Sequence, residues 1–189
     1  SGMSTIVGHV SPDLDCIGSI WFLKRYGGMA DAEVLFVNTG NPDPVVLAAA
    51  DAVVDTGRVF DPGILRFDHH HFAGAAANET CATLQVAQAL VIARPDFDFN
   101  PIWPIIELIY AGDTGKSAAN ESRAVGIHAL LSSKKASRTL DDHGLLAYGF
   151  ELLDTLATGL IAQDAARKNL AAHTVYRSAD GLLVALKNA

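Results

Sequence analysis

Short, almost unbroken apolar segments alternate with helical patterns through the first third of the chain. Between the apolar segments at 4–10 and 33–39, apolar residues recur on one helix face from Asp15 to Tyr26. Gly27 and Gly28 end this helical pattern. A second, short helix is predicted over 44–50. Strands are predicted over residues 4–10, 33–39, 52–57 and 64–70. This alternation predicts a mostly parallel sheet that is flanked by helices.

From Glu79 onward the pattern is helical. Helices are predicted over residues 79–93, 102–112, 120–132 and 142–172, with one more strand over 181–188. A polar stretch at 132–141 marks a weak boundary. The expected fold class is therefore α/β, with a helical C-terminal half. We expect one domain over residues 3–189, preceded by two residues, Ser1 and Gly2, that look like a cloning scar.

Composition narrows the classes of partner and compartment. The chain has 189 residues, of which 50% are hydrophobic, so it can bury a sizeable core. Its net charge of −7 disfavours long nucleic acid as a partner. Cys16 and Cys81 form no CxxC motif and suit a reducing cytosol, and the apolar runs fall short of a membrane span. We therefore expect a cytoplasmic protein without a membrane partner.

The segment RFDHHHF (66–72) concentrates unusual chemistry. It holds three of the seven histidines of the chain directly after Asp68. An internal run of this kind is a surface cluster, a structural patch or part of a metal site. The choice depends on whether other segments supply suitable ligands.

Acidic and imidazole side chains follow three of the four predicted strands, and another Asp ends a predicted helix. They are His9, Asp13, Asp15, Asp55, Asp68, His69, His70, His71 and Asp113. Because ligands gather at the carboxyl ends of strands in open α/β sheets, these groups are expected at one edge. Carboxylate and imidazole suit manganese, magnesium, zinc or iron, whereas the lack of thiolates disfavours a structural zinc site.

Each residue also has a structural explanation. Asp13 or Asp15 could cap the following helix, Asp55 and Asp113 could be turn residues, and His9 could be an ordinary core histidine. These separate explanations do not account for the placement of all the residues at one predicted edge. The remaining histidines are expected to be structural or at the surface. They are His128, His143 and His173.

Four segments resemble, in order, the motifs of the DHH phosphoesterase superfamily. They are GHVSPDLDCIGS (8–19), VVDTG (53–57), RFDHHH (66–71) and AGDTG (111–115). The stretch at 55–70 is also similar to the Myg-type exonuclease branch, although the first motif does not follow that branch. The resemblance covers residues from about His9 to Gly115. No motif typical of a second, substrate-gripping domain follows Gly115.

The superfamily resemblance implies a site for two divalent ions, usually Mn²⁺, with Mg²⁺, Co²⁺ or Fe²⁺ as alternatives. It places His9, Asp13 and Asp55 on one ion. It places Asp15, Asp55, His69 and Asp113 on the other, so that Asp55 bridges the pair. It also implies that His70 faces the phosphate and that Asp68 orients an imidazole. Further candidates for substrate contact are His71, to which no motif assigns a role, Arg66 and Lys116.

The expected function is metal-dependent hydrolysis of a phosphodiester, phosphomonoester or phosphoanhydride bond. The expected substrate is a small nucleotide, a short oligonucleotide or pyrophosphate, and a homo-oligomer is left open. A water activated between two cations would attack phosphorus, so no Ser or Cys nucleophile is needed. The alternative is a metal-binding domain without turnover that acts as a regulatory or assembly module.

Overall fold

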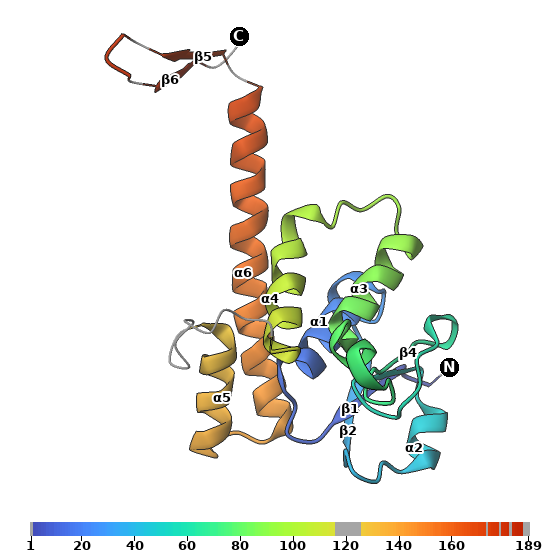
Figure 1. Cartoon of the computed structure of the whole chain (residues 1–189). Helices are drawn as coiled ribbons and strands as arrows, with labels where there is room; N and C mark the ends of the chain where they lie inside the picture. Colours follow the sequence, from blue (N-terminus) through green and yellow to red (C-terminus); the bar gives the residue numbers. More distant parts are fainter. Residues whose placement is uncertain (1, 116–125, 173, 178, 182, 187–189) are drawn as a thin grey trace.

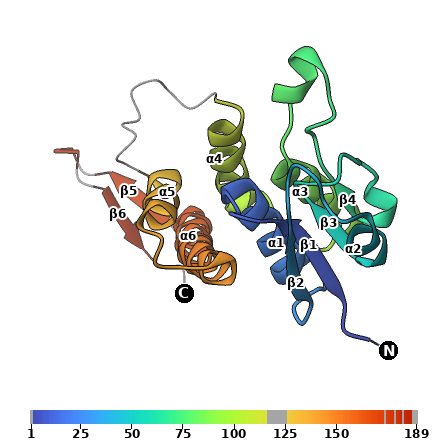
Figure 2. The same cartoon turned by 90° about the horizontal axis from the view of Figure 1, so that it is seen from below.

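The computed structural model contains a four-stranded, all-parallel sheet, which lies toward one side of the molecule, while α5 and α6 lie toward the other (Figures 1 and 2). The structure describes residues 2–115, 126–172, 174–177, 179–181 and 183–186. The strands are β1 (Thr5–His9), β2 (Glu33–Val37), β3 (Ala52–Val54) and β4 (Arg66–Phe67), in the order β2-β1-β3-β4. The predicted α/β fold with a mostly parallel sheet is confirmed, although β3 and β4 are shorter than expected.

Neighbouring residues of a strand point to opposite faces of the sheet. Both faces carry apolar side chains here, and helices cover both of them. Ile6 packs into the larger core, with fully buried Trp21 and Phe22. Val7 packs on the other face, with Val53, against α2 (Pro44–Ala49). The larger core is covered by α1 (Leu14–Tyr26), α3 (Ala82–Ala93), α4 (Trp103–Asp113), α5 (Ile127–Ser137) and α6 (Asp142–Ala171). Three short 3₁₀ helices lie at Pro62–Ile64, Gly74–Asn78 and Asn100–Ile102.

The C-terminal half is helical, as predicted, but its details differ from the sequence pattern. Helix α5 continues to Ser137, so residues 132–137 of the polar stretch are helical and residues 138–141 connect α5 to α6. The first part of the helix predicted at 120–132 lies outside the described residues. The predicted last strand corresponds to β6 (Leu183–Leu186), which pairs with β5 (Thr174–Arg177) in an antiparallel hairpin. The pattern did not predict β5.

Helix α6 is long and only partly packed. Its amino-terminal half lies against α1, where the Trp21 Nε1–H donates to Asp154 Oδ1 at 2.8 Å and Arg25 forms an ion pair with Asp154. Its other half projects beyond the sheet, with the β5–β6 hairpin at its far end (Figure 1). By length and hydropathy α6 could cross a membrane, but the core helices of soluble proteins pass the same test.

The topology of the sheet marks one crevice. The chain passes from β1 to β2 on one side of β1, and then returns to β3 on the other side. In open α/β sheets ligands bind outside the carboxyl ends of the strands at such a switch point. This point lies between His9, which ends β1, and Asp55, which directly follows β3.

Candidate metal centre

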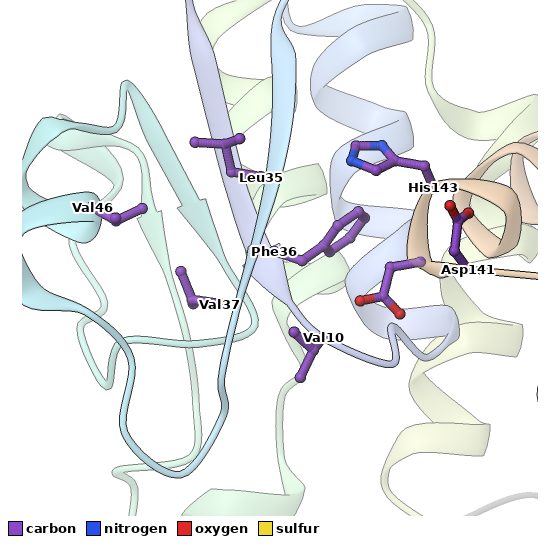
Figure 3. A pocket seen from close by; sticks show the side chains of 8 residues that line it. Val10, Leu35, Phe36, Val37, Val46, Asp141 and His143 are labelled. Atoms are coloured by element: carbon purple, nitrogen blue, oxygen red, sulfur yellow. The ribbon is translucent and has the colours of Figure 1, made fainter.

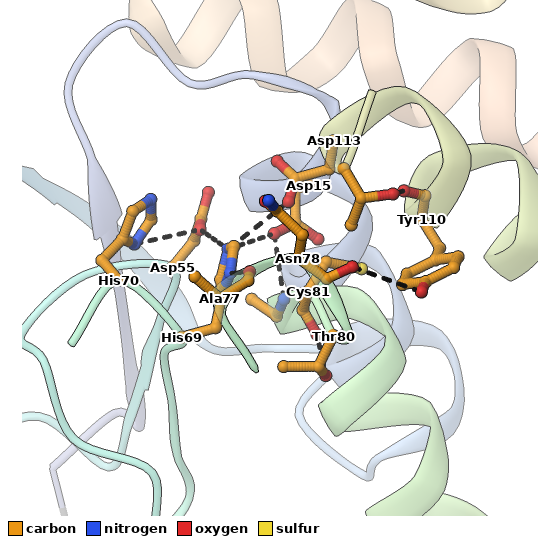
Figure 4. Close-up of polar contacts among 12 residues, drawn as sticks. Asp15, Asp55, His69, His70, Ala77, Asn78, Thr80, Cys81, Tyr110 and Asp113 are labelled. Atoms are coloured by element: carbon orange, nitrogen blue, oxygen red, sulfur yellow. Dashed lines mark hydrogen bonds and ion pairs between the residues drawn. The ribbon is translucent and has the colours of Figure 1, made fainter. Parts of the chain in front are cut away.

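Aspartate and histidine side chains converge beside the carboxyl ends of β1 and β3, and Figure 4 shows Asp15, Asp55, His69, His70 and Asp113 together there. The first turn of α1 and the last residue of α4 add their side chains to those at the strand ends. The converging residues are the six ligand candidates and His70: His9, Asp13, Asp15, Asp55, His69, His70 and Asp113. The structure thus brings together all seven of these sequence-predicted residues.

Asp55 lies at the centre of this cluster, and its two oxygens face different neighbours. Oδ2 lies 3.0 Å from His9 Nε2, whereas Oδ1 lies 3.8 Å from both His69 Nε2 and His70 Nδ1. Its carboxylate is buried, and its backbone has a left-handed φ of 57°. Such backbone conformations are uncommon outside glycine and cluster at functional sites. The carboxylate can therefore serve two positions at once.

A second group surrounds His69. Its Nε2 lies 3.4 Å from Asp113 Oδ2 and 3.7 Å from Asp15 Oδ2. The two Asp15 oxygens also accept hydrogen bonds from the backbone N–H groups of Ala82 and Thr83, at the start of α3. These bonds fix the Asp15 carboxylate and supply the side-chain cap that α3 otherwise lacks at Cys81.

Two imidazole rings are oriented by backbone carbonyls. His9 Nδ1 lies 2.9 Å from the Val10 carbonyl oxygen, and His69 Nδ1 lies 3.2 Å from that of Ala77. When each Nδ1–H donates to its carbonyl, the Nε2 lone pair is aimed into the cluster. This arrangement is the one in which a histidine ligates a metal through Nε2.

The donor set fits divalent cations. Asp55 Oδ1 and His69 Nε2 are buried, and among the described residues neither has a hydrogen-bond partner. Such orphaned atoms need an explanation, and a cation supplies one. Ligand atoms bound to one ion at about 2.1 Å lie roughly 3 Å apart. The 3.0–3.8 Å separations in the cluster are close to that value. The buried cluster could therefore hold metal.

Electrostatics also favour a cation. Burial raises the pKa of Asp55, and the nearby Asp15 charge raises it further. The same two causes raise the pKa of Asp113 to about 6. Burial lowers the pKa of His9, but hydrogen bonds to Asp13 and Asp55 outweigh this effect and raise it to about 10. The cluster thus holds more negative charge than its protein neighbours compensate, which a bound cation would relieve.

Asp13 occupies the capping position that the sequence predicted for it or Asp15, and it also lies beside His9. It is the N-cap of α1, where Oδ1 accepts a hydrogen bond from Cys16 N at 2.9 Å. The same oxygen lies 3.7 Å from His9 Nε2. Asp15, the other capping candidate, instead lies inside the first turn of α1. A cap at Asp13 therefore does not exclude a contact with metal.

Asp68 orients the imidazole of His70. Its Oδ1 accepts from His70 Nδ1 at 2.5 Å, and this hydrogen bond raises the pKa of His70. The His70 side chain is 53% exposed, which leaves its Nε2 accessible. His71 has a different setting: its Nδ1 is buried and lacks a hydrogen-bond partner among the described residues, and its ring lies 4.4 Å from that of Phe72.

The remaining candidates for substrate contact are Arg66 and Lys116, and the structure describes only Arg66. Arg66 lies at the start of β4, and its guanidinium donates to four backbone carbonyl groups. They belong to Leu47, Ala50, Asp51 and Ile64. These bonds tie β4 to the end of α2, so the position of Arg66 indicates a structural role and does not favour substrate contact. Lys116 lies outside the described residues.

Two buried thiols near the cluster were not predicted as site residues. Cys16 Sγ lies close to His9 and Asp55, and Cys81 is beside Asp15 at the start of α3. Burial raises the pKa of both thiols, which keeps them protonated. Cys16 directly follows Asp15 in the first motif, which was the one available signal, whereas nothing in the sequence pattern linked Cys81 to the site.

A separate hollow of about 520 Å³ lies at the carboxyl end of β2 (Figure 3). Its lining residues are Val10, Leu35, Phe36, Val37, Val46, Asp141, Asp142 and His143. None of the metal-ligand candidates is among them. The His143 ring packs edge-on against Phe36 with centroids 5.1 Å apart, and His128 Nε2 bonds the Leu108 carbonyl, so both histidines have structural contacts.

Comparison with known protein families identifies a match over part of the chain. Residues 13–90 match the family model MYG1_exonuc, which is described as an uncharacterised protein family (UPF0160). This family belongs to the DHH phosphoesterase superfamily, so the resemblance found in the sequence is confirmed. The matched segment contains every ligand candidate except His9 and Asp113. Neither the curated proteins nor the solved structures contain a significant match.

Proposed function

Because residues 13–90 match an exonuclease family of the DHH superfamily, we propose that this protein is a metal-dependent phosphohydrolase. Its substrate is a small nucleotide or a short oligonucleotide, and its cofactors are two divalent cations, with Mn²⁺ favoured. The observation that carries the proposal is the position of Asp55, whose two oxygens face two different groups of ligand atoms. A carboxylate in this position can bridge two ions.

The chain would divide its residues between the two ions. His9, Asp13 and Asp55 would hold the first ion, and Asp15, Asp55, His69 and Asp113 would hold the second. When bound, two divalent cations lower the pKa of water and neutralise phosphate charge. His70, held by Asp68, would donate a hydrogen bond from Nε2 to a phosphoryl oxygen and stabilise the charge that develops there.

The acidic chain limits the substrate. With a net charge of −7, the protein is unsuited to bind long nucleic acid through an extended phosphate backbone. A small substrate needs only the charge compensation that the metal cluster and His70 provide. We accordingly propose a cytoplasmic enzyme that acts on small phosphorylated molecules without a membrane partner.

Hydrolysis of bis(p-nitrophenyl) phosphate tests the proposal. Protein stripped with chelator and reloaded with Mn²⁺ should release p-nitrophenolate, and the chelated protein should not. A panel of pyrophosphate, 3′-phosphoadenosine 5′-phosphate, cyclic di-AMP and dinucleotides would then define the bond that is cleaved. If the protein binds Mn²⁺ but hydrolyses no compound of the panel, the proposed phosphohydrolase activity is contradicted. That result would support the alternative of a metal-binding regulatory module.

A further inference from the structure

Two phenylalanine residues follow members of the metal cluster closely in the chain without a role in it: Phe60 comes after Asp55, and Phe72 after His69 and His70. Phe60 is 43% exposed and Phe72 is half-buried. Their ring centroids lie 6.3 Å apart, with the ring planes at 86°. Two rings at a right angle form a corner that offers a face and an edge to a planar group. Exposed aromatic residues of this kind are the platforms on which single-stranded nucleic acids stack their bases.

Both rings are tied by backbone contacts to residues of the cluster. The Phe72 N–H donates to the carbonyl of His69 at 3.0 Å, so this ring follows the candidate ligand by one tight turn. The loop that carries Phe60 starts at Asp55, and Arg58 N on this loop donates to Asp68 Oδ2 at 2.7 Å. The corner is therefore carried by two segments whose backbones are hydrogen-bonded to His69 and Asp68, the two residues that precede His70.

The corner is also firmly supported. Asp61, next to Phe60, exchanges two backbone hydrogen bonds with Arg66, of 2.8 and 3.0 Å, and its side chain accepts from Gly63 N. Behind the other ring, the imidazole of His71 packs at 4.4 Å from Phe72. A platform that is fixed before binding loses little conformational entropy when a base stacks on it.

We propose that Phe60 and Phe72 form a stacking site for the nucleobase next to the phosphate held at the metal cluster, a role that rests on the proposed function. Arg58, exposed two residues before Phe60, supplies a cation for a neighbouring phosphate. Stacking reads the π-face that every base has, so the site accepts different bases. It thereby selects nucleotides over phosphate esters without a base. In this arrangement His71 is a positioning residue that supports the Phe72 ring.

A pair of esters with the same leaving group tests the site. Thymidine 5′-(p-nitrophenyl phosphate) carries a base, whereas ethyl p-nitrophenyl phosphate carries none. For Phe60→Ala, the ratio of kcat/KM between the two esters should fall by on the order of tenfold to a hundredfold. Phe60→Trp should restore the ratio, and Ile92→Ala, which truncates a residue that is 82% exposed on α3, should keep it. An unchanged ratio in Phe60→Ala would overturn the proposal.

Binding of trithymidylate provides a second readout that does not require turnover. With Ca²⁺ or Mn²⁺ present, Phe60→Ala and Phe72→Leu should each weaken its affinity by about tenfold or more, while Ile92→Ala should not. If the wild-type chain cleaves neither ester but shows this pattern, the proposed hydrolysis fails and the stacking site stands. If the three variants bind as the wild type does, the rings have another occupant, such as a second copy of the chain.

Discussion

Asp68 holds the histidine run in a single arrangement through its two carboxylate oxygens. Oδ1 accepts from the backbone N–H of His69 at 2.8 Å and from His70 Nδ1 at 2.5 Å, while Oδ2 accepts from Arg58 N. Both oxygens are used, and the hydrogen bond from His70 helps to hold the pKa of Asp68 below its usual range, against the opposing effect of burial. Three adjacent imidazoles therefore have three different environments.

His70→Ala should separate chemistry from metal binding. The variant loses a group aimed at the phosphate, so kcat should fall by about a hundredfold or more, while calorimetric Mn²⁺ affinity stays within a few-fold of the wild type. His71→Ala should lower kcat less, because its ring packs against Phe72 and does not face the phosphate. Loss of metal from His70→Ala, or a greater loss of activity in His71→Ala, would show that the assigned roles are shifted along the run.

At this scale the sequence predicted which residues gather, but not how they are oriented. Residue type and position after a strand were sufficient to select His9, Asp55 and His69. The contacts that aim the imidazoles come from backbone carbonyls of Val10 and Ala77, which no residue type encodes. The same limit applies to Arg66, since its backbone partners on α2 depend on how β4 meets that helix.

At the scale of elements, the packing of α6 on α1 depends on close approach at one glycine. A Cβ at Gly149 would lie only 2.6 Å from Ile17 Cγ2. The two helices also share the contacts of Asp154 with Trp21 and Arg25. These contacts hold the amino-terminal half of α6 against α1, the helix that contains Asp15.

Gly149→Ala should destabilise the protein although alanine is the better helix former. Overpacking against Ile17 costs about 1–3 kcal/mol, which exceeds a gain of about 0.5–1 kcal/mol in helix propensity. Gly159→Ala is the matched control, because a Cβ there has no neighbour within 4 Å and only the gain applies. Urea unfolding should therefore give shifts of opposite sign for the two variants. An equal stabilisation of both would mean that α6 does not pack closely on α1.

The elements differ in how well the sequence predicted them. Helices α1 and α6 have long apolar patterns with Asp residues at their starts, and their ends were predicted within a few residues. Strand β4 pairs over only Arg66 and Phe67, because the chain turns at Asp68 to fix the histidines. Strand β5 has four residues and, within the described part of the chain, pairs with β6 alone, so its short segment carried no periodic signal of its own.

At the scale of the whole molecule, the metal cluster connects parts of the chain that lie far apart in sequence. Its candidate ligands come from β1, α1, the segments after β3 and β4, and the end of α4. Without a cation, the carboxylates of these elements repel one another across the crevice. Metal binding should therefore stabilise the entire fold and not only the site, because the same contacts exist only in the folded chain.

Thermal unfolding with and without Mn²⁺ tests this coupling. At free Mn²⁺ a hundredfold above its dissociation constant, each ion adds about 2.7 kcal/mol, which for a chain of this size raises Tm by about 5–10 °C. Asp55→Asn removes the shared carboxylate, so it should lose most of the rise from both ions at once. Asp51→Asn is the matched control, since this exposed carboxylate lies at the opposite end of β3 and bonds only Thr5 N among the described residues. Calorimetric titration should give close to two ions per wild-type chain, and a full Mn²⁺-dependent rise in Asp55→Asn would contradict a bridging role for this residue.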